Sequence, residues 1–150
     1  MSKISFYDLG ISSKLIAKRK LIKFLHQIFK EENTSVEKAD IIFCTDKYLL
    51  SLNRNFLAHN FYTDTLTFPL SNKHKPVIGE IYISVDRVRY NSKVFGHPFQ
   101  NELVRVIIHS VLHLCGYQDK PLEKSKKMIL KQEEYLKRWS LKMKPNNSST

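Results

Sequence analysis

The residues best placed to do chemistry are two histidines near the end of the most apolar segment of the chain. His109 and His113 are four positions apart in the run IIHSVLHLCGY. On a helix, side chains four apart leave the same face with Cβ atoms about 5–6 Å apart, so both imidazoles can bind one Zn²⁺ at about 2.0–2.1 Å. Gly116 can end the helix with a positive φ, and Asp119 follows six residues after His113. This spacing predicts a zinc site held by two imidazoles and one carboxylate.

The histidine spacing alone is not specific, because a chain with six histidines meets it by chance. The alternative interpretation is that both rings are hydrogen-bonded residues of the core or of a cleft. The apolar surroundings favour metal binding, since unpaired buried imidazoles are costly, and so do the glycine and the carboxylate that follow. Three protein ligands leave a fourth position on zinc for water, which indicates a catalytic rather than a structural metal.

The residues Ser110 and Cys115, close to the two histidines, further limit the reactions and ligand sets that this segment could support. Zinc peptidases with two histidines four apart carry a glutamate general base after the first one, and here that position is Ser110. A peptidase is therefore disfavoured. Cys115 lies two residues after His113 and faces the other side of the helix, so we expect it to be a core thiol and not a ligand.

Alternating and helical apolar patterns predict the elements that position this site. Strands are expected at 4–7, 40–45, 66–68 and 79–84, with the last two paired through the loop at 71–76. Helices are expected at 12–29, 46–52, 86–96, 101–116 and 121–139, with N-caps at Ser12 or Ser13, Asp46 and Asp86, and with Pro121 in the first turn of the last helix. This order predicts an α+β fold, a small α/β sandwich, with residues 1–144 forming a single domain and 145–150 a disordered tail.

Composition points to a polyanionic partner. The 150 residues carry 25 Lys plus Arg against 14 Asp plus Glu, a formal net charge of +11. Such an excess favours encounter with nucleic acid, with an anionic membrane surface as the second candidate.

No apolar run reaches the 18 residues of a membrane span, and we see no secretory signal. Two cysteines, Cys44 and Cys115, lie in apolar runs, so a reducing, cytoplasmic location is expected, although a pairing between them is not excluded by the sequence.

At this point the sequence resembles the YbeY family of bacterial endoribonucleases and ribosomal RNA maturation factors. The run from His109 to Asp119 is similar to the family signature H-G-x-L-H-L-x-G-Y-D-H, and the runs Thr63–Pro69 (TDTLTFP) and Gly79–Ser84 (GEIYIS) are similar to its T-D-V-L-S-F-P and G-D-I-x-I. The motifs cover about residues 50–120 in the family order. The resemblance implies a mixed four-stranded sheet packed with about five helices, the zinc helix lining a cleft.

The chain departs from the family pattern at two positions that matter. The third histidine ligand of the family falls on Asp119, which predicts one Zn²⁺ per chain held by His109, His113 and Asp119, because a carboxylate is a legitimate ligand. Leu52-Asn53, followed by Phe56, is similar to the family's L-N-x-x-(Y/F)-R motif, and the arginine that often follows the aromatic residue falls here on Leu57. Arg54, His59 and Lys120 are the nearest cationic candidates for contacts to RNA phosphates, and the alternative for each is a solvated surface residue.

The resemblance implies a zinc-dependent, single-strand endoribonuclease that acts in ribosomal RNA maturation at the 16S 3′ end and in ribosome quality control. Its catalytic group is expected to be a water on the metal, acting either as the nucleophile or as a base on the ribose 2′-hydroxyl. The expected partners are single-stranded ribosomal RNA and ribosomal subunit or assembly proteins, with no membrane. The alternative function is an RNA-binding ribosome-assembly factor whose metal is structural and which cleaves little or not at all.

Overall fold

The computed structural model describes residues 2–144 and is built on a mixed sheet of four strands. The strands are β1 (Lys3–Asp8), β2 (Val36–Cys44), β3 (Thr65–Pro69) and β4 (Val77–Ser84), in the spatial order β1-β2-β4-β3. The pairs β1–β2 and β2–β4 are parallel, and β3 pairs with β4 antiparallel, as the loop between them predicts. The α+β class and the mixed sheet implied by the resemblance are confirmed.

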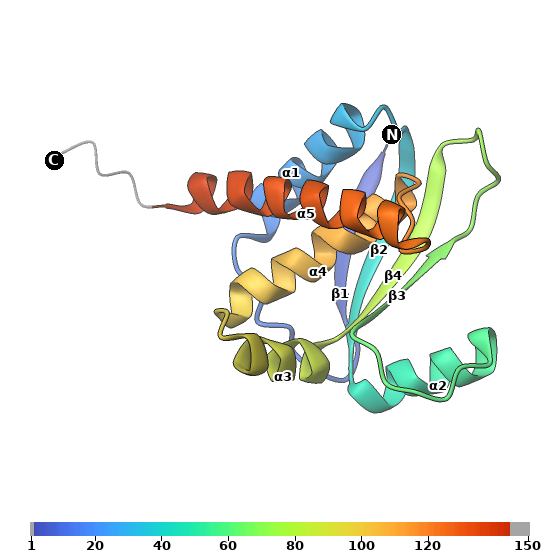
Figure 1. Ribbon diagram of the computed structural model, residues 1–150, viewed down its shortest axis with the longest axis vertical. Coiled ribbons are helices and arrows are strands. Elements are labelled where there is room, and N and C mark those ends of the chain that lie inside the picture. Colours follow the sequence, from blue (N-terminus) through green and yellow to red (C-terminus); the bar gives the residue numbers. More distant parts are fainter. Residues whose placement is uncertain (1, 145–150) are drawn as a thin grey trace, which may run out of the picture.

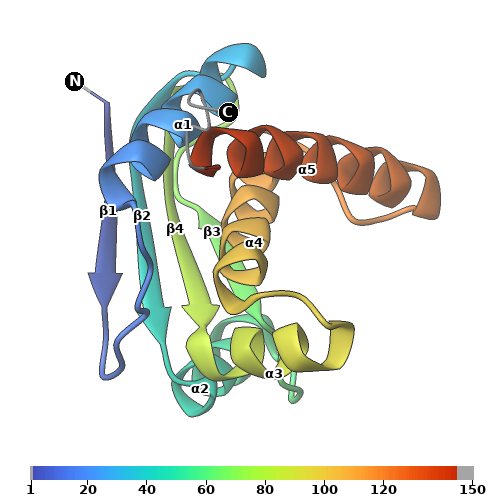
Figure 2. The ribbon, with the colours of Figure 1, turned by 90° about the vertical axis from the view of Figure 1, so that its left-hand side faces the viewer.

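Three helices lie on one side of this sheet, two of them packed directly on it (Figures 1 and 2). They are α1 (Lys18–Glu31), α4 (Phe99–Leu114) and α5 (Leu122–Met143). Because strand side chains alternate between faces, every second residue points toward these helices and is apolar, namely Ile4, Ala39, Ile41, Phe43, Ile81 and Ile83. Helix α5 crosses over α4 in Figure 1, so α4 lies between the sheet and α5.

The other two helices lie at the ends of strands. Helix α2 (Asp46–Leu57) follows β2 and packs Leu49 against a second apolar cluster on the opposite face of the sheet, which includes Leu66. Helix α3 (Val85–Phe95) follows β4 without a loop and packs against α4. Residues 2–144 therefore contain five helices, the number expected from the sequence.

The first helix begins later than predicted. It starts at Lys18 and not at Ser12 or Ser13. Ser13 is buried and its hydroxyl accepts a hydrogen bond from a backbone N–H two residues on, while the side chain of Gln100 on α4 hydrogen-bonds the same segment twice, at 2.7 and 3.2 Å. These long-range bonds satisfy the backbone outside the helix, so the serines do not cap it.

Two predicted N-caps are also wrong by one or two residues. Thr45 caps α2 and Ser84 caps α3, each hydroxyl accepting a hydrogen bond from the backbone N–H three residues on. Asp46 and Asp86 lie in the first turns of these helices instead, where a carboxylate is favoured by the helix dipole. Hydroxyl and carboxyl side chains are both good N-caps, so the sequence alone does not show which of two neighbouring residues caps a helix.

The remaining helix limits agree with the sequence to within four residues, except that α2 continues to Leu57, five residues past its predicted end. Helix α4 starts at Phe99 and not at Asn101, and Pro121 precedes the first residue of α5 as its N-cap. Gly96 and Gly116 follow α3 and α4 with φ of 70° and 104°, as predicted for helix ends. The predicted tail, 145–150, lies outside the described residues.

Between residues 2 and 144, we find no helix with the length and apolarity that a membrane crossing needs. Cys44 and Cys115 are both free thiols, which answers the pairing left open by the sequence.

Candidate metal centre

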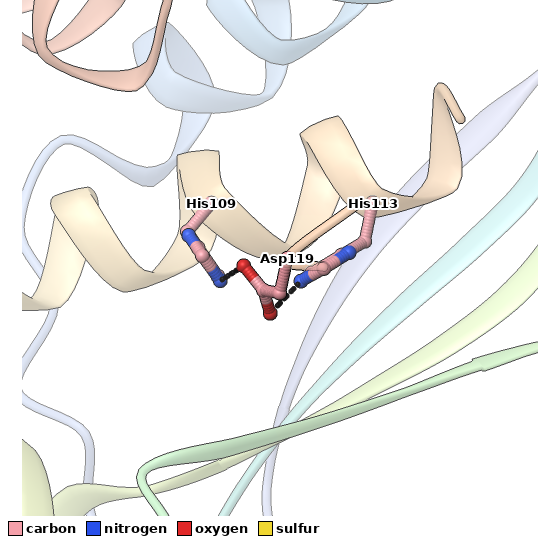
Figure 3. A group of neighbouring side chains, drawn as sticks. All are labelled: His109, His113 and Asp119. Carbon is pink, nitrogen blue, oxygen red and sulfur yellow. Dashed lines mark hydrogen bonds and ion pairs between the residues drawn. The ribbon is translucent and has the colours of Figure 1, made fainter. Parts of the chain in front are cut away.

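Helix α4 presents His109 and His113 on the same side, toward β3 (Figure 3). Their ring centroids are 4.7 Å apart and the rings are nearly perpendicular, at 86°. Each side chain is about a quarter exposed, at 24% and 25%, whereas the helix residues on either side of them are buried in the core. The apolar residues thus anchor the helix, and the two imidazoles emerge at its one accessible edge.

The loop after α4 brings a carboxylate back to these rings. Gly116 takes its positive φ directly after the helix, and the backbone N–H of Tyr117 bonds back to the carbonyl of Leu112. Asp119 consequently returns between the imidazoles, with Oδ2 2.9 Å from Nε2 of His113 and Oδ1 3.8 Å from Nε2 of His109 (Figure 3). The structure therefore brings together the three residues that the spacing predicts as ligands.

Both imidazoles are oriented by oxygen atoms on their other side. Nδ1 of His109 lies 2.6 Å from Oε1 of Gln132 on α5, and Nδ1 of His113 lies 3.1 Å from the carbonyl oxygen of Tyr117. Amide oxygens only accept hydrogen bonds, so each Nδ1 must carry a proton. In a neutral ring the other nitrogen, Nε2, then has a free lone pair. The side-chain N–H of Gln132 donates to Glu133 at 2.9 Å, which keeps Oε1 turned toward His109.

The resulting donor set fits a small divalent cation. Two imidazole lone pairs and a carboxylate converge, and the three ligand atoms lie within 4.8 Å of one another. Donors bound at about 2.0–2.2 Å on a tetrahedral ion lie about 3.4 Å apart, and the two measured separations from Asp119, 2.9 and 3.8 Å, bracket this value. Two nitrogens and one oxygen are ligands that suit Zn²⁺.

A pocket of about 330 Å³ opens beside the three candidate ligands. Its other wall is β3 and the residues before it, including Asp64, Thr65 and Thr67. Burial raises the pKa of Asp64 above its usual value, and the nearby His109 opposes that shift. The Thr67 hydroxyl is buried and has no hydrogen-bond partner among residues 2–144. Polar residues thus line the wall of the pocket opposite the candidate ligands.

A hydrogen bond joins α4 and β3, the two walls of this pocket. Ser110 donates to the carbonyl of Val106 at 2.9 Å, so its oxygen accepts from the hydroxyl of Thr65, also at 2.9 Å. Ser110 is fully buried in this role. It ties α4 to β3 and offers no group to the pocket, in agreement with the argument against a peptidase.

The cationic residues predicted for RNA binding do not line this pocket. Arg54 is exposed on α2 and its Nε donates to Asn60, and His59 stacks on Phe61 with ring centroids 5.1 Å apart. Lys120 is exposed beside Asp119. Their contacts to phosphate stay predictions.

Two residues of the site lie outside the set predicted from sequence. Gln132 is one of several polar residues on α5, and only the crossing of α5 over α4 brings it to His109. Asp64 belongs to the motif TDTLTFP, which is similar to the family pattern. That similarity indicated a functional segment, but it assigned no role to Asp64. Both positions depend on contacts between elements distant in sequence.

Comparison with known proteins decides the family. Residues 10–140 match the family model described as "Endoribonuclease YbeY". The chain belongs to the YbeY family. The resemblance seen in the sequence motifs is thereby confirmed, and the matched range contains the three candidate ligands as well as Asp64 and Gln132.

Individual YbeY relatives match nearly the whole chain. A protein named Endoribonuclease YbeY from Porphyromonas gingivalis is 38% identical over 136 residues, covering 91% of this chain and 89% of the relative. One of the same name from Flavobacterium psychrophilum is 41% identical over 121 residues, covering 81% and 86%. A solution structure of a Thermotoga maritima protein superposes with a TM-score of 0.67 at 32% identity, covering 94% of each chain.

Proposed function

We propose that this YbeY-family protein is a zinc-dependent endoribonuclease that cleaves single-stranded RNA. The observation that carries the proposal is the convergence of His109, His113 and Asp119 at the edge of an open, polar pocket. The name Endoribonuclease YbeY, carried by relatives that match most of the chain, supports RNA as the substrate. The net charge of +11 supports a polyanion as the partner.

The chain's own residues have separate tasks in this proposal. His109 and His113 would hold Zn²⁺ through Nε2, and Asp119 would hold it through its carboxylate. Bound Zn²⁺ supplies Lewis-acid chemistry, because it lowers the pKa of water toward about 7 and polarises a phosphoryl oxygen. Gln132 and the Tyr117 carbonyl keep the Nδ1 protons in place and so fix the direction of both lone pairs.

The pocket favours a catalytic metal over the alternative of a structural one. A structural zinc is normally enclosed by four protein ligands, whereas the part of the chain that the structure describes brings three together here, and Asp119 is 51% exposed. The space of about 330 Å³ beside them can admit a phosphodiester group. This geometry supports cleavage rather than binding alone.

Within this proposal the substrate is ribosomal RNA, and the reaction belongs to maturation of the 16S 3′ end and to ribosome quality control in the cytoplasm. The family resemblance supports this assignment, and so do the reduced thiols Cys44 and Cys115, which suit a reducing compartment. Ribosomal subunits or assembly proteins are the further partners in this proposal.

The test compares wild type with His113→Ala on a structured ribosomal RNA fragment, with binding and cleavage measured separately. His97→Ala is the matched control, because His97 is exposed and lies outside the site. We expect His113→Ala to bind RNA and to lose cleavage, while His97→Ala retains both. Undiminished cleavage by folded, metal-free His113→Ala would contradict the proposal. Products ending in a 2′,3′-cyclic phosphate would show that direct hydrolysis by water is not the only route.

A further inference from the structure

A second, larger hollow adjoins the candidate metal centre. It has a volume of about 660 Å³ and lies between the β3–β4 loop and the loops that follow α1 and α4. Lys73, His74 and Lys75 line it from the β3–β4 loop, together with uncharged polar residues such as Asn33 and Asn72. We call this hollow the basic groove.

Shared wall residues connect the basic groove to its neighbours on both sides. Pro69 lines both the metal pocket and the basic groove. At the other end, Cys115 and Gly116 line both the basic groove and a further pocket of about 300 Å³, whose wall contains Lys124 and Lys127 from α5. The three hollows therefore adjoin in series, and they form a path that leads away from the metal ligands.

The charged residues that line this path beyond the metal pocket are all basic. None of the described residues that line the basic groove or the α5 pocket is acidic. Lys73, Lys75, Lys124 and Lys127 form no ion pair within residues 2–144, whereas basic residues elsewhere, such as Arg105, are paired with carboxylates. Helices α1 and α4 both end at the groove, and helix C termini carry partial negative charge, so the lysine side chains alone make it attractive to anions.

We infer that the basic groove and the α5 pocket bind the sugar–phosphate backbone of a single RNA strand whose scissile phosphate lies in the metal pocket. Lysines spaced along a path suit the successive phosphates of a nucleic-acid strand. This inference rests on the proposed function for its substrate, but it concerns binding and can be tested without cleavage.

The test replaces the four lysines of the path by alanine, as K73A/K75A, K124A/K127A and the quadruple variant. The matched control is K126A/K137A, which removes two exposed charges from the same helix α5 outside the path. Binding of a 2′-O-methyl RNA dodecamer and of a trinucleotide is followed by fluorescence anisotropy at several salt concentrations. The modified sugar blocks attack by the 2′-hydroxyl, and gel analysis verifies that the oligonucleotides stay intact.

We expect the quadruple variant to bind the dodecamer about 10-fold to 100-fold more weakly at low salt, with a salt slope reduced by about 0.7 per lost phosphate contact. Each double variant should lose part of this affinity, the control should bind like wild type, and trinucleotide binding should change little. Equal affinity and salt slope for wild type and the quadruple variant would overturn the inference, as would an equal loss in the control. A wild-type protein that binds the dodecamer through these lysines but does not cleave unmodified RNA would contradict the proposed function and leave the groove supported.

Discussion

His109 on α4 donates a hydrogen bond from Nδ1 to Oε1 of Gln132 on α5, over 2.6 Å. Gln132 is buried, and its amide is itself oriented by Glu133. The last helix of the chain therefore controls the tautomer of a candidate metal ligand, although it contributes no ligand.

Replacing this amide should weaken metal binding without removing a ligand. Q132M keeps the length of the side chain and loses the acceptor, so we expect zinc affinity to fall by about 10-fold to 100-fold, the range found for such supporting residues. Competition with a chelating dye measures the affinity. Q27M, the same substitution on the exposed surface of α1, should leave it unchanged. An affinity for Q132M equal to wild type would show that the hydrogen bond does not orient His109.

The third ligand can be tested by restoring the residue type of the family pattern. D119A should lose zinc affinity, whereas D119H should keep it. A carboxylate ligand adds a negative charge that makes water on the metal less acidic, so removing that charge should lower the pH midpoint of RNA cleavage. The pH profile of kcat/KM measures this shift. A midpoint for D119H at or above that of wild type would contradict the assignment of Asp119 as a ligand.

The end of α4 is packed closely against the sheet at Gly79. A Cβ added there would lie 2.7 Å from Cδ2 of Leu114, the residue next to His113. We expect G79A to lower the free energy of unfolding by about 1–3 kcal/mol, because Leu114 must leave its position. In a double-mutant cycle, L114V removes the clashing Cδ atoms, so the G79A/L114V protein should lose less than the sum of the two single changes. If the losses in the free energy of unfolding were additive, the contact between residues 79 and 114 would not be the cause of the destabilisation by G79A.

The two thiols should be inert in the folded protein. Burial raises the pKa of both Cys44 and Cys115 to about 12, so neither forms much thiolate near neutral pH. Ellman's reagent at about pH 8 should react slowly with native protein and rapidly with both thiols after denaturation. Fast reaction of one thiol in the native protein would contradict this account of its surroundings.

The parts of the site that follow from local sequence were predictable. One helix and the loop after it place His109, His113 and Asp119. Helix periodicity determines that the two histidines, one turn apart, point to the same side. The strands could be located for a similar reason, because their apolar alternation reflects burial against α1 and α4.

Features that depend on contacts between distant elements could not be predicted. Gln100 holds the segment before α1 out of the helix from more than 80 residues away, and nothing near Ser13 in the sequence indicates this. Gln132 reaches His109 only because α5 crosses α4. The continuity of Lys73 and Lys124 along one path likewise arises from the way that the loops after α1, β3 and α4 meet.

The metal content of the purified protein shows whether three side chains hold one catalytic zinc ion. Protein purified without added metal should contain one zinc ion per chain, and H109A should contain none while remaining folded by circular dichroism. The exposed control H97A should retain the ion. A folded wild-type protein that contains no metal and gains none on exposure to zinc, or an H109A protein that binds zinc as tightly as wild type, would contradict the account.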